Sequence, residues 1–357
     1  MQTVHFDLPH LYYLPQFMPV VQVLRNSGAE LSVTLYADSD ALNITKESVA
    51  NEGLSYVIVD DEKQALEHYR TSKPDWIVFG NAPCISYAML KKDGIKLAFM
   101  QHGIGPKSCY YTASEFPFDV RFVEGETRKE RLQEMFPDGT FVDVGYAKLD
   151  PLFNDAEDTI SLKSLGLDPR KKTLLYAPTF YPSSIECFSK DWPAELANYN
   201  LIIKPHFFSL TKSKYAKQKK ILESWSKFEN VYLCSVDSYS LIPFMQFADI
   251  LLSEASSTVF EFAALDKPIV WCDFYRVRWS YRGIFKYRLA QRMDEDLKLF
   301  DLICDRAKSP NEVLSKIEHC IKNRNEKSDV RSELTLSMAG KTDGQVSERI
   351  VNYLLAN

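Results

Sequence analysis

Residues 248–270 read ADILLSEASSTVFEFAALDKPIV, and this stretch carries the clearest structural signal in the chain. An apolar run at 249–252 has the length of a strand, and a turn of small and hydroxyl residues follows it. A helical pattern comes next, and a second strand-like run occupies 268–272. A strand, a helix and a second strand in this order predict a βαβ unit, whose two strands are parallel.

The same alternation extends over most of the chain. Helical patterns such as 15–26 and 61–71 separate short runs that are rich in β-branched and aromatic residues. These runs lie at 31–36, 56–59, 76–79, 97–100, 120–123 and 141–144, and, after a polar stretch at 150–168, at 173–177, 201–204 and 231–234. The pattern predicts two similar α/β halves, each with a parallel sheet, joined near 150–168.

Length and composition indicate an ordinary globular protein with two domains. The chain has 357 residues, of which 45% are hydrophobic and 25% charged, and a domain usually holds about 150 residues. The net charge of −5 provides no positive field for nucleic acid. No apolar run approaches the roughly 20 residues that cross a bilayer. Because the N-terminus also lacks a secretory signal pattern, we expect a cytoplasmic protein.

Common fingerprints of metal and nucleotide sites are missing. The seven scattered cysteines include no CxxC pair, so they fit neither a disulfide framework nor a zinc site. GxGxxG, Walker A, HExxH and GxSxG motifs do not occur. Acidic clusters at 38–40 and 294–296 superficially suggest a metal site, but such pairs in polar segments are usually solvated. We therefore expect no metal and no cofactor, with magnesium left open.

Two of the six histidines follow directly on predicted strands, where open α/β sheets bind their ligands. His102 is followed by a glycine-containing turn that can bring the imidazole to the surface of a cleft. A loop histidine that is bonded only to backbone is the alternative. His206 follows Lys204 and Pro205, and a cation so close to an imidazole suits an anion.

Three hydroxyl residues, Ser256, Ser257 and Thr258, lie where the run 249–252 turns into the helix. A serine at this position can cap the helix, and the free N–H groups at a helix start can instead hold a phosphate. A cap needs one hydroxyl, whereas the chain supplies three. This surplus favours phosphate binding.

Several short motifs occur in a fixed order along the chain. They are Gln101-His102-Gly103 with Pro106-Lys107, Val144-Gly145-Tyr146-Ala147-Lys148-Leu149-Asp150, Leu175-Tyr176-Ala177-Pro178-Thr179-Phe180, Lys204-Pro205-His206, Ser253-Glu254-Ala255-Ser256-Ser257 with Glu261-Phe262-Ala263 and Lys267-Pro268, and Asp343-Gly344 with Ser347, Arg349 and Ile350. In this order they resemble the CDP-glycerol glycerophosphotransferase family over roughly residues 95–355. That family contains the wall-teichoic-acid primases and polymerases and their capsule-synthesis relatives.

Two motifs depart from the family pattern. Residues 253–257 read Ser-Glu-Ala-Ser-Ser where members commonly have Thr-Asp-Tyr-Ser-Ser, and residues 101–104 read Gln-His-Gly-Ile where members often have Trp-His-Gly-Thr. The first departure concerns the alcohol portion of the donor, and the second concerns the acceptor side. The polyol and the acceptor are therefore not specified by the resemblance.

The resemblance implies an α/β protein of the GT-B fold, in which two Rossmann-like domains with parallel sheets face each other across a cleft. It implies an acceptor-side domain at 1–155 and a nucleotide-donor domain at 156–335. The remaining segment, 336–357, would form a helix that packs back on the first domain.

The resemblance also implies the reaction. A polyol phosphate, foremost glycerol phosphate, would pass from a CDP-activated donor to an acceptor hydroxyl in a teichoic acid-like or capsule polymer, and CMP would leave. His102, as the base, and His206, which would also hold phosphate, would be the catalytic residues. The remaining site residues would be Thr179, Lys204, Glu254, Ser256, Ser257 and Thr258 on the donor phosphate and Gly103 and Lys107 on the acceptor side.

The acceptor would be lipid-linked or polymeric, so we expect peripheral contact with the inner face of the cell membrane. The segment 276–288 mixes basic with aromatic residues and could bind anionic headgroups or a polyphosphate acceptor, or could be a basic surface loop.

Other functions are possible on the same fold. A GT-B glycosyltransferase would hold a nucleotide sugar with the same phosphate-binding residues, and a UDP-sugar 2-epimerase would carry more carboxylates in its cleft. A nucleotide-binding protein without activity would leave the two histidines without a purpose.

Overall fold

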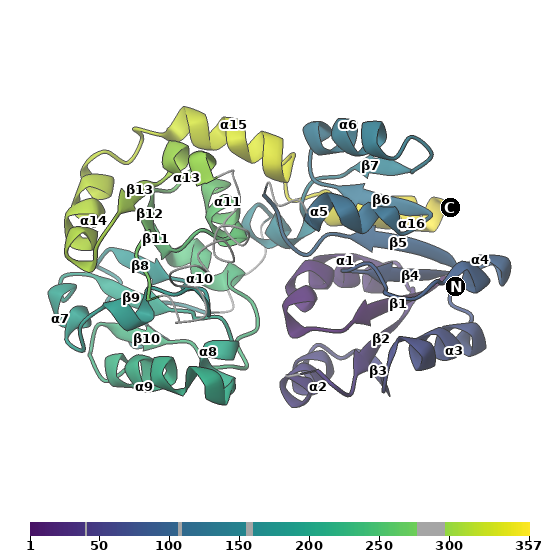
Figure 1. Cartoon of the computed structure of the whole chain (residues 1–357), viewed down its shortest axis with the longest axis horizontal. Coiled ribbons are helices and arrows are strands. Elements are labelled where there is room, and N and C mark those ends of the chain that lie inside the picture. The colour runs from purple at the N-terminus through teal and green to yellow at the C-terminus, as the bar shows by residue number, and fades with distance from the viewer. Residues whose placement is uncertain (40, 106–108, 155–159, 277–296) are drawn as a thin grey trace, which may run out of the picture. The chain divides into compact units, whose positions relative to one another are not determined.

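The computed structural model of the chain describes residues 1–39, 41–105, 109–154, 160–276 and 297–357. The chain forms two compact units (Figure 1). Unit 1 comprises Met1–Ala156 and Leu336–Asn357, and unit 2 comprises Glu157–Thr335. Each unit is built on one parallel sheet.

The sheet of unit 1 has, within the described residues, seven strands in the order β3-β2-β1-β4-β5-β6-β7. Every neighbouring pair is parallel. The strands are β1 (Thr3–Leu8), β2 (Glu30–Tyr36), β3 (Ser55–Val59), β4 (Trp76–Phe79), β5 (Lys96–Met100), β6 (Val120–Val123) and β7 (Phe141–Asp143). The accompanying helices are α1 (Leu14–Asn26), α2 (Leu42–Asn51), α3 (Glu62–Ser72), α4 (Ala88–Lys92), α5 (Cys109–Thr112), α6 (Glu126–Met135) and α16 (Val346–Ala356), with short 3-10 turns η1 (Leu11–Tyr13), η2 (Ala113–Glu115) and η3 (Ala147–Leu152).

The central strand β1 places alternate side chains against different helices. Phe6 packs on Phe17 of α1, with 5.1 Å between the ring centroids. His5 stacks on His68 of α3 at 5.5 Å. Because successive side chains of a strand point to opposite faces of the sheet, α1 and α3 cover opposite faces.

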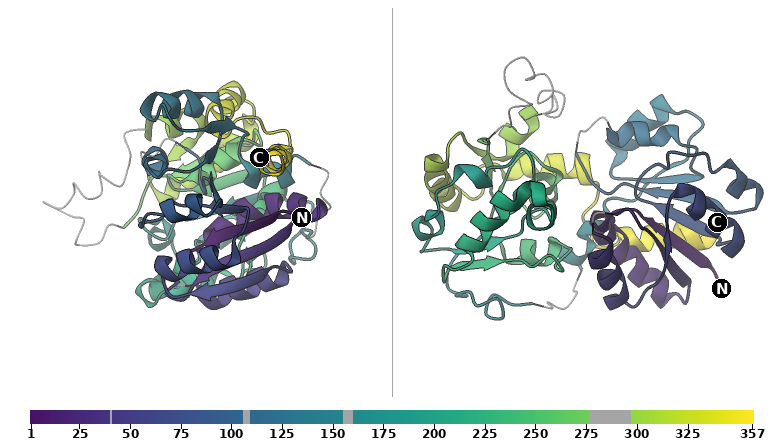
Figure 2. Two further views of the ribbon diagram at one scale, coloured as in Figure 1. Left: turned by 90° about the vertical axis from the view of Figure 1, so that its right-hand side faces the viewer. Right: turned by 60° about the horizontal axis from the view of Figure 1, so that its bottom comes forward.

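The C-terminal helix α16 is anchored within unit 1 by a buried carboxylate. Asp150 accepts hydrogen bonds from the backbone N–H groups of Val346 (3.1 Å) and Ser347 (2.6 Å), which are the first residues of the helix. At its other end the Leu354 carbonyl accepts the indole N–H of Trp76 at 3.0 Å. Figure 2 shows α16, in yellow, beside the purple N-terminal elements, and α16 packs against α1.

The sheet of unit 2 has six strands within the described residues, in the order β10-β9-β8-β11-β12-β13, again with every neighbouring pair parallel. The strands are β8 (Thr173–Tyr176), β9 (Asn200–Ile203), β10 (Val231–Leu233), β11 (Ile250–Ser253), β12 (Ile269–Cys272) and β13 (Asp305–Ala307). The helices are α7 (Trp192–Glu195), α8 (Phe208–Thr211), α9 (Ala216–Trp225), α10 (Ile242–Phe247), α11 (Ser257–Ala263), α13 (Leu297–Ile303), α14 (Val313–Lys322) and α15 (Ser328–Ala339), with 3-10 turns η4 (Ile185–Cys187), η5 (Ser213–Tyr215) and η8 (Pro310–Glu312).

An aromatic cluster fills one side of the unit 2 sheet. Phe188 and Trp192 stack with 3.9 Å between their centroids, and Tyr176 of β8 meets Trp192 edge-on at 5.3 Å. Trp225, at the end of α9, is fully buried in the same core. Burying a large aromatic side chain stabilises a fold by about 1.5–3 kcal/mol, so this cluster is a principal support of the sheet.

The predicted fold class is confirmed, because each unit is a Rossmann-like α/β structure. Counted within its unit, each sheet follows the strand order 3-2-1-4-5-6 of that fold, with β7 added in unit 1. The order reverses between β1 and β4 in unit 1 and between β8 and β11 in unit 2. Such switch points create a crevice at the carboxyl ends of the strands, where ligands bind.

The predicted strands and the helices at 15–26 and 61–71 are present, with end shifts of a few residues. Two strands were not predicted, β1 and β13. Within the described residues, no helix has the length and apolar character needed to span a membrane.

Candidate active site

His102 lies two residues after the end of β5, next to the crevice of unit 1. Its Nδ1 is 2.9 Å from the carbonyl oxygen of Gly80, which follows β4. A carbonyl can only accept a hydrogen bond, so Nδ1 donates and the neutral ring carries its lone pair on Nε2. The backbone carbonyl of His102 in turn accepts the hydroxyl of Tyr146 at 2.9 Å. These two contacts fix the tautomer and the position of an imidazole that can accept a proton.

Aromatic residues of the turn after β1 surround this imidazole. The Tyr13 ring lies 4.6 Å and the Tyr12 ring 5.2 Å from that of His102, and His10 stacks on Tyr12 at 5.1 Å. A Cβ at Gly80 would lie 3.0 Å from the Tyr13 ring, which is tighter than an ordinary contact, so this close packing favours glycine. Sequence analysis did not single out these residues. Residues that follow a central strand line the crevice, and these were missed because β1 itself was not predicted.

Of the two acceptor-side residues predicted beside His102, only Gly103 is among the described residues. Gly103 is buried, directly after the histidine. Lys107 lies outside the described residues.

Glu254 lies directly after β11, at the crevice of unit 2. One carboxylate oxygen accepts the backbone N–H of Thr179 at 2.7 Å, and the other accepts the backbone N–H and the hydroxyl of Ser184, both at 2.6 Å. Burial raises the pKa of Glu254, and these hydrogen bonds oppose the rise. Glu254 thereby ties the loop after β8 to the end of β11, and direct contact of this carboxylate with a bound donor stays a prediction.

Thr179 belongs to that same loop. Its hydroxyl donates to the carbonyl of Pro182, and its backbone N–H is held by Glu254. Sequence analysis predicted Thr179 as a phosphate ligand and did not find Ser184. The hydrogen bonds show that both residues help shape the loop.

His206 follows β9 and has the opposite tautomer to His102. The backbone N–H of Phe208 donates to its Nδ1 at 3.2 Å, so the proton of the neutral ring lies on Nε2. Burial, together with the charges of Lys204 and Lys212, lowers the pKa of His206 to about 3. The Phe180 ring lies 4.6 Å away. His206 is therefore a neutral N–H donor in the physiological range.

The serine-rich turn leads into α11. Ser256 occupies the N-cap position in an extended conformation, but its hydroxyl makes no capping hydrogen bond, so the capping alternative does not hold for the Ser256 side chain. Its Oγ instead lies 3.3 Å from that of Ser253, which donates to the Ala177 carbonyl at 2.8 Å. Ser256, Ser257 and Thr258 are all partly exposed, as is Lys204 after β9, which is separated from β11 by β8. The hydroxyl turn, the lysine and His206 thus lie at the carboxyl ends of β11 and β9 within one unit.

Some predicted features fall outside the described residues. Of the basic segment 276–288, only Arg276 is described. The acidic cluster 294–296 and Asp40 are likewise outside. Across the described ranges, no group of three or more histidine, cysteine, aspartate or glutamate side chains is arranged to hold a metal ion.

Sequence comparisons relate this chain to enzymes of teichoic acid synthesis. The model of the family described as CDP-Glycerol:Poly(glycerophosphate) glycerophosphotransferase matches residues 117–356. A teichoic acid glycerol-phosphate primase of Bacillus spizizenii is 26% identical over 299 residues, which cover 80% of this chain and 73% of that protein. A primase of the same name from Bacillus subtilis is 31% identical over 134 residues, 38% of this chain and 33% of that protein.

Solved structures show the same fold at low identity. The wall teichoic acid polymerase TagF is 16% identical, with a TM-score of 0.66 over 99% of this chain and 88% of that one. A UDP-GlcNAc 2-epimerase from Neisseria meningitidis is 16% identical, with a TM-score of 0.59 over the whole of both chains. At such identities the likeness concerns the fold alone. The family match, in contrast, spans more than half of the sequence, and the chain therefore belongs to the CDP-glycerol:poly(glycerophosphate) glycerophosphotransferase family.

Proposed function

We propose that this protein transfers glycerol phosphate from CDP-glycerol to an acceptor hydroxyl of a teichoic acid-type surface polymer and releases CMP. Family membership supports the reaction class. The names of its relatives, teichoic acid glycerol-phosphate primase and poly(glycerol phosphate) polymerase, support the polymer. The observation that supports the chemistry most directly is that the two histidines have opposite tautomers. The lone pair of His102 is on Nε2, whereas His206 carries its proton on Nε2.

In the proposed reaction His102 is the general base. The acceptor hydroxyl gives its proton to Nε2 of His102 while its oxygen forms a bond to the phosphorus that bears the glycerol. The bond from that phosphorus to the bridging oxygen breaks, and CMP leaves with the electron pair. A neutral imidazole near pH 7 suits this role because it accepts a proton without a large pKa shift.

The donor diphosphate is, in this proposal, held by unit 2. The Nε2–H of His206 donates to a phosphate oxygen, and Lys204 supplies a positive charge. Ser256, Ser257 and Thr258 offer hydroxyl donors, while Glu254 holds the neighbouring loop around Thr179 in place. Fixed donors directed at charge that grows on the leaving phosphate lower the barrier to transfer. In this proposal these residues fill their roles without a metal ion.

Nucleotide release from a panel of donors tests the function. The purified protein, with a lipid-linked or glycerol phosphate-ended acceptor, is expected to release CMP from CDP-glycerol. CDP-ribitol and UDP-sugars, assayed in parallel, are expected to be turned over more slowly. Faster release of UDP from a UDP-sugar would instead identify a glycosyltransferase, and release without any acceptor would oppose transfer.

We also propose that the protein binds peripherally to anionic lipids at the inner face of the cell membrane, because a lipid-linked acceptor would lie there. The sequence of segment 276–288 supports this contact, because each basic residue near an anionic surface contributes about 1 kcal/mol. Charge reversal of Arg276, Arg278 and Arg282 to glutamate is expected to abolish co-sedimentation with phosphatidylserine-containing vesicles. Unchanged sedimentation of the triple variant would show that this segment does not mediate membrane binding.

A further inference from the structure

A buried ion pair lies next to the turn that follows His102. Its members are Glu124, directly after β6, and Arg128, in the first turn of α6, and each side chain is only 2% exposed. The Nε of Arg128 lies 3.0 Å from Oε2 of Glu124. Burial raises the pKa of Glu124, and the charges of Arg128 and Arg121 oppose this rise. The three residues therefore form one charged cluster inside unit 1.

Arg128 connects this ion pair to the turn that follows the proposed base. Its Nη2 donates to the backbone carbonyl of Gly105 at 2.7 Å, three residues after His102. Gly105 has a φ of 115°, in a region of backbone space that favours glycine. The arginine thus holds the backbone of a turn whose shape depends on glycine at that position.

The same guanidinium lies over the aromatic rings of α5. Its central carbon is 5.8 Å from the centre of the Tyr110 ring and 5.0 Å from that of the Tyr111 ring. The Tyr110 ring in turn lies edge-on to the imidazole of His102, with 6.1 Å between the centroids. Arg128 therefore contacts both the backbone that follows the imidazole and an aromatic ring that packs on it.

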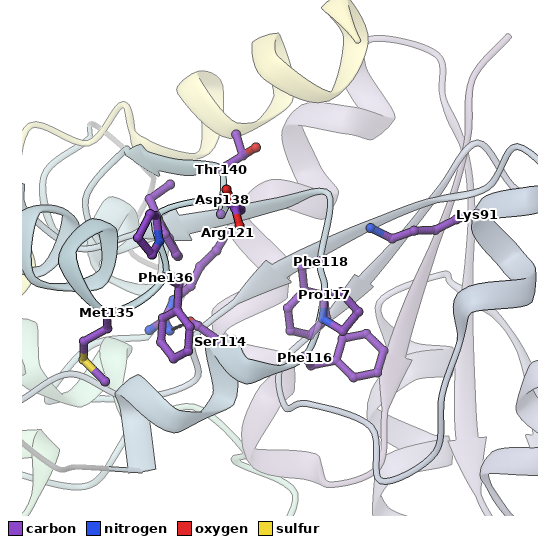
Figure 3. A pocket seen from close by; sticks show the side chains of 13 residues that line it. Lys91, Ser114, Phe116, Pro117, Phe118, Arg121, Met135, Phe136, Asp138 and Thr140 are labelled. Carbon is purple, nitrogen blue, oxygen red and sulfur yellow. Dashed lines mark hydrogen bonds between the residues drawn. The ribbon is translucent and has the colours of Figure 1, made fainter.

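A second buried arginine holds Tyr110 by its backbone. Arg121 is 2% exposed and donates to the Tyr110 carbonyl at 2.6 Å and to the hydroxyl of Ser114. Figure 3 shows Arg121 and Ser114 in the lining of a cavity of about 440 Å³. This cavity is lined by residues that precede β6 and β7, whereas His102 follows β5, so the cavity and the imidazole lie at opposite edges of the parallel sheet. The two arginines thus approach Tyr110 at different groups.

Stability alone does not explain why an arginine occupies position 128. Taking an ion pair out of water is unfavourable, and apolar side chains of similar volume often stabilise a fold equally well. The Nη1 of Arg128 also has no hydrogen-bond partner among the described residues, which adds to the unfavourable term. An arginine differs from an apolar residue in its planar fork of donors, which sets fixed directions toward Glu124 and Gly105.

We propose that Arg128 is a positioning residue that acts through His102. By fixing the turn at Gly105 and the ring of Tyr110, it keeps the imidazole hydrogen-bonded to the Gly80 carbonyl, with the lone pair on Nε2. The effect on turnover rests on the proposed function, in which His102 is the base. The effect on the imidazole itself does not, because it requires no substrate.

The tautomer of His102 tests this role without turnover. Arg128→Lys keeps a positive charge opposite Glu124 but lacks the planar fork that reaches two partners. Because hydrogen-bond partners set the tautomer of a neutral histidine, the Nδ1–H form is expected to dominate in the unmodified protein and the Nε2–H form to appear in Arg128→Lys.

The measurement is the imidazole ¹⁵N chemical shift, taken at a pH where the ring is neutral. The signal that is missing from His102→Ala identifies the residue. A dominant Nε2–H form in the unmodified protein, or an unchanged Nδ1–H form in Arg128→Lys, would overturn the proposal.

Arg131 provides the matched control. It lies three residues further along α6, is exposed, and its guanidinium also lies over the Tyr111 ring, at 4.2 Å. Arg131→Lys is expected to leave both the tautomer of His102 and kcat unchanged. Equal effects of the two lysine variants would show that α6 as a whole, and not Arg128, determines the position of the imidazole.

A double-mutant cycle tests whether Arg128 acts through His102. Arg128→Lys alone is expected to lower kcat about 10- to 100-fold, since a displacement of about 1 Å can lower a rate by about 100-fold. Donor affinity is expected to stay the same, because the proposed donor residues lie in unit 2. In His102→Ala, which has no imidazole to position, the same exchange is expected to lower kcat no further. Additive losses would contradict the proposal.

A second variant and a second readout complete the test. If thermal unfolding shows that Arg128→Lys does not fold, Glu124→Asp takes its place. That variant keeps both charges, withdraws the carboxylate from Arg128 by one CH₂, and is expected to change the tautomer of His102 in the same direction. Failure of the proposed function would appear differently, as absence of CMP release from the unmodified protein while the tautomer still responds to Arg128→Lys.

Discussion

Replacing His102 by alanine is expected to lower kcat by about 10²- to 10⁴-fold, the usual contribution of general acid–base catalysis. The hydrogen bond from Nδ1 to the Gly80 carbonyl leaves Nε2 as the proton acceptor, and alanine removes that acceptor. The residues of unit 2 that are proposed to bind the donor phosphate are untouched by the change. Donor affinity, measured by calorimetric titration of CDP-glycerol, is therefore expected to change little while steady-state turnover falls.

Chemical rescue separates catalysis from a structural effect at this position. Added imidazole is expected to restore part of the activity of His102→Ala, because it can occupy the space of the lost ring and accept the proton. A merely destabilised variant would not respond to imidazole. Near-normal turnover of His102→Ala without imidazole would contradict the role of His102 as the base.

The pH dependence of kcat gives a second readout for the same residue. The pKa of His206 is lowered to about 3, so this imidazole does not change charge where imidazoles normally titrate, near pH 6.5. An acidic limb of kcat in that range therefore does not come from His206, and His102→Ala tests whether the proposed base is its source. The limb should disappear from the residual activity of His102→Ala, and its persistence would show that another group titrates.

The strands that sequence analysis found are those with continuous apolar runs. The central strand β1 was missed because His5 and Asp7 interrupt its apolar residues. In the folded chain the carboxylate of Asp7 accepts the hydroxyls of Tyr36 at 2.8 Å and Tyr69 at 2.7 Å. Burial raises the pKa of Asp7 to about 6. Its partners lie 29 and 62 residues away in sequence, so no local pattern could show that this polar residue is buried.

Motif residues were easier to find than to assign. Asp150, from one family motif, caps α16, and Lys267, from another, donates to the carbonyl of Gln246 at the end of α10 at 2.8 Å. Glu254 was placed among the donor ligands, yet its oxygens hold Thr179 and Ser184. A linear motif therefore identifies which residues are important, but it does not give the role of each residue. The hydrogen-bond partners in the structure show when a motif side chain holds a loop or a helix in place.

The two histidines are equivalent in sequence, since both follow a strand, and only their partners distinguish them. The Gly80 carbonyl makes His102 an acceptor at Nε2, and the Phe208 N–H makes His206 a donor there. This difference predicts that His206→Ala weakens donor binding, in contrast to His102→Ala. A hydrogen bond to a charged group contributes about 1.5–3 kcal/mol. The dissociation constant of CDP-glycerol is accordingly expected to rise about 10- to 150-fold, at 1.4 kcal/mol per decade.

Two further variants make the His206 result specific. Glutamine carries an N–H donor at a reach similar to Nε2, so His206→Gln is expected to recover part of the affinity that alanine loses. His319, whose side chain is 43% exposed in the same unit, provides the control, and His319→Ala is expected to bind CDP-glycerol normally. Because His206 is neutral well below pH 7, the loss in His206→Ala should be the same at pH 6 and pH 8. If His206→Ala binds the donor as tightly as the unmodified protein does, the diphosphate is held elsewhere, and Lys204-Pro205-His206 serves the loop rather than the ligand.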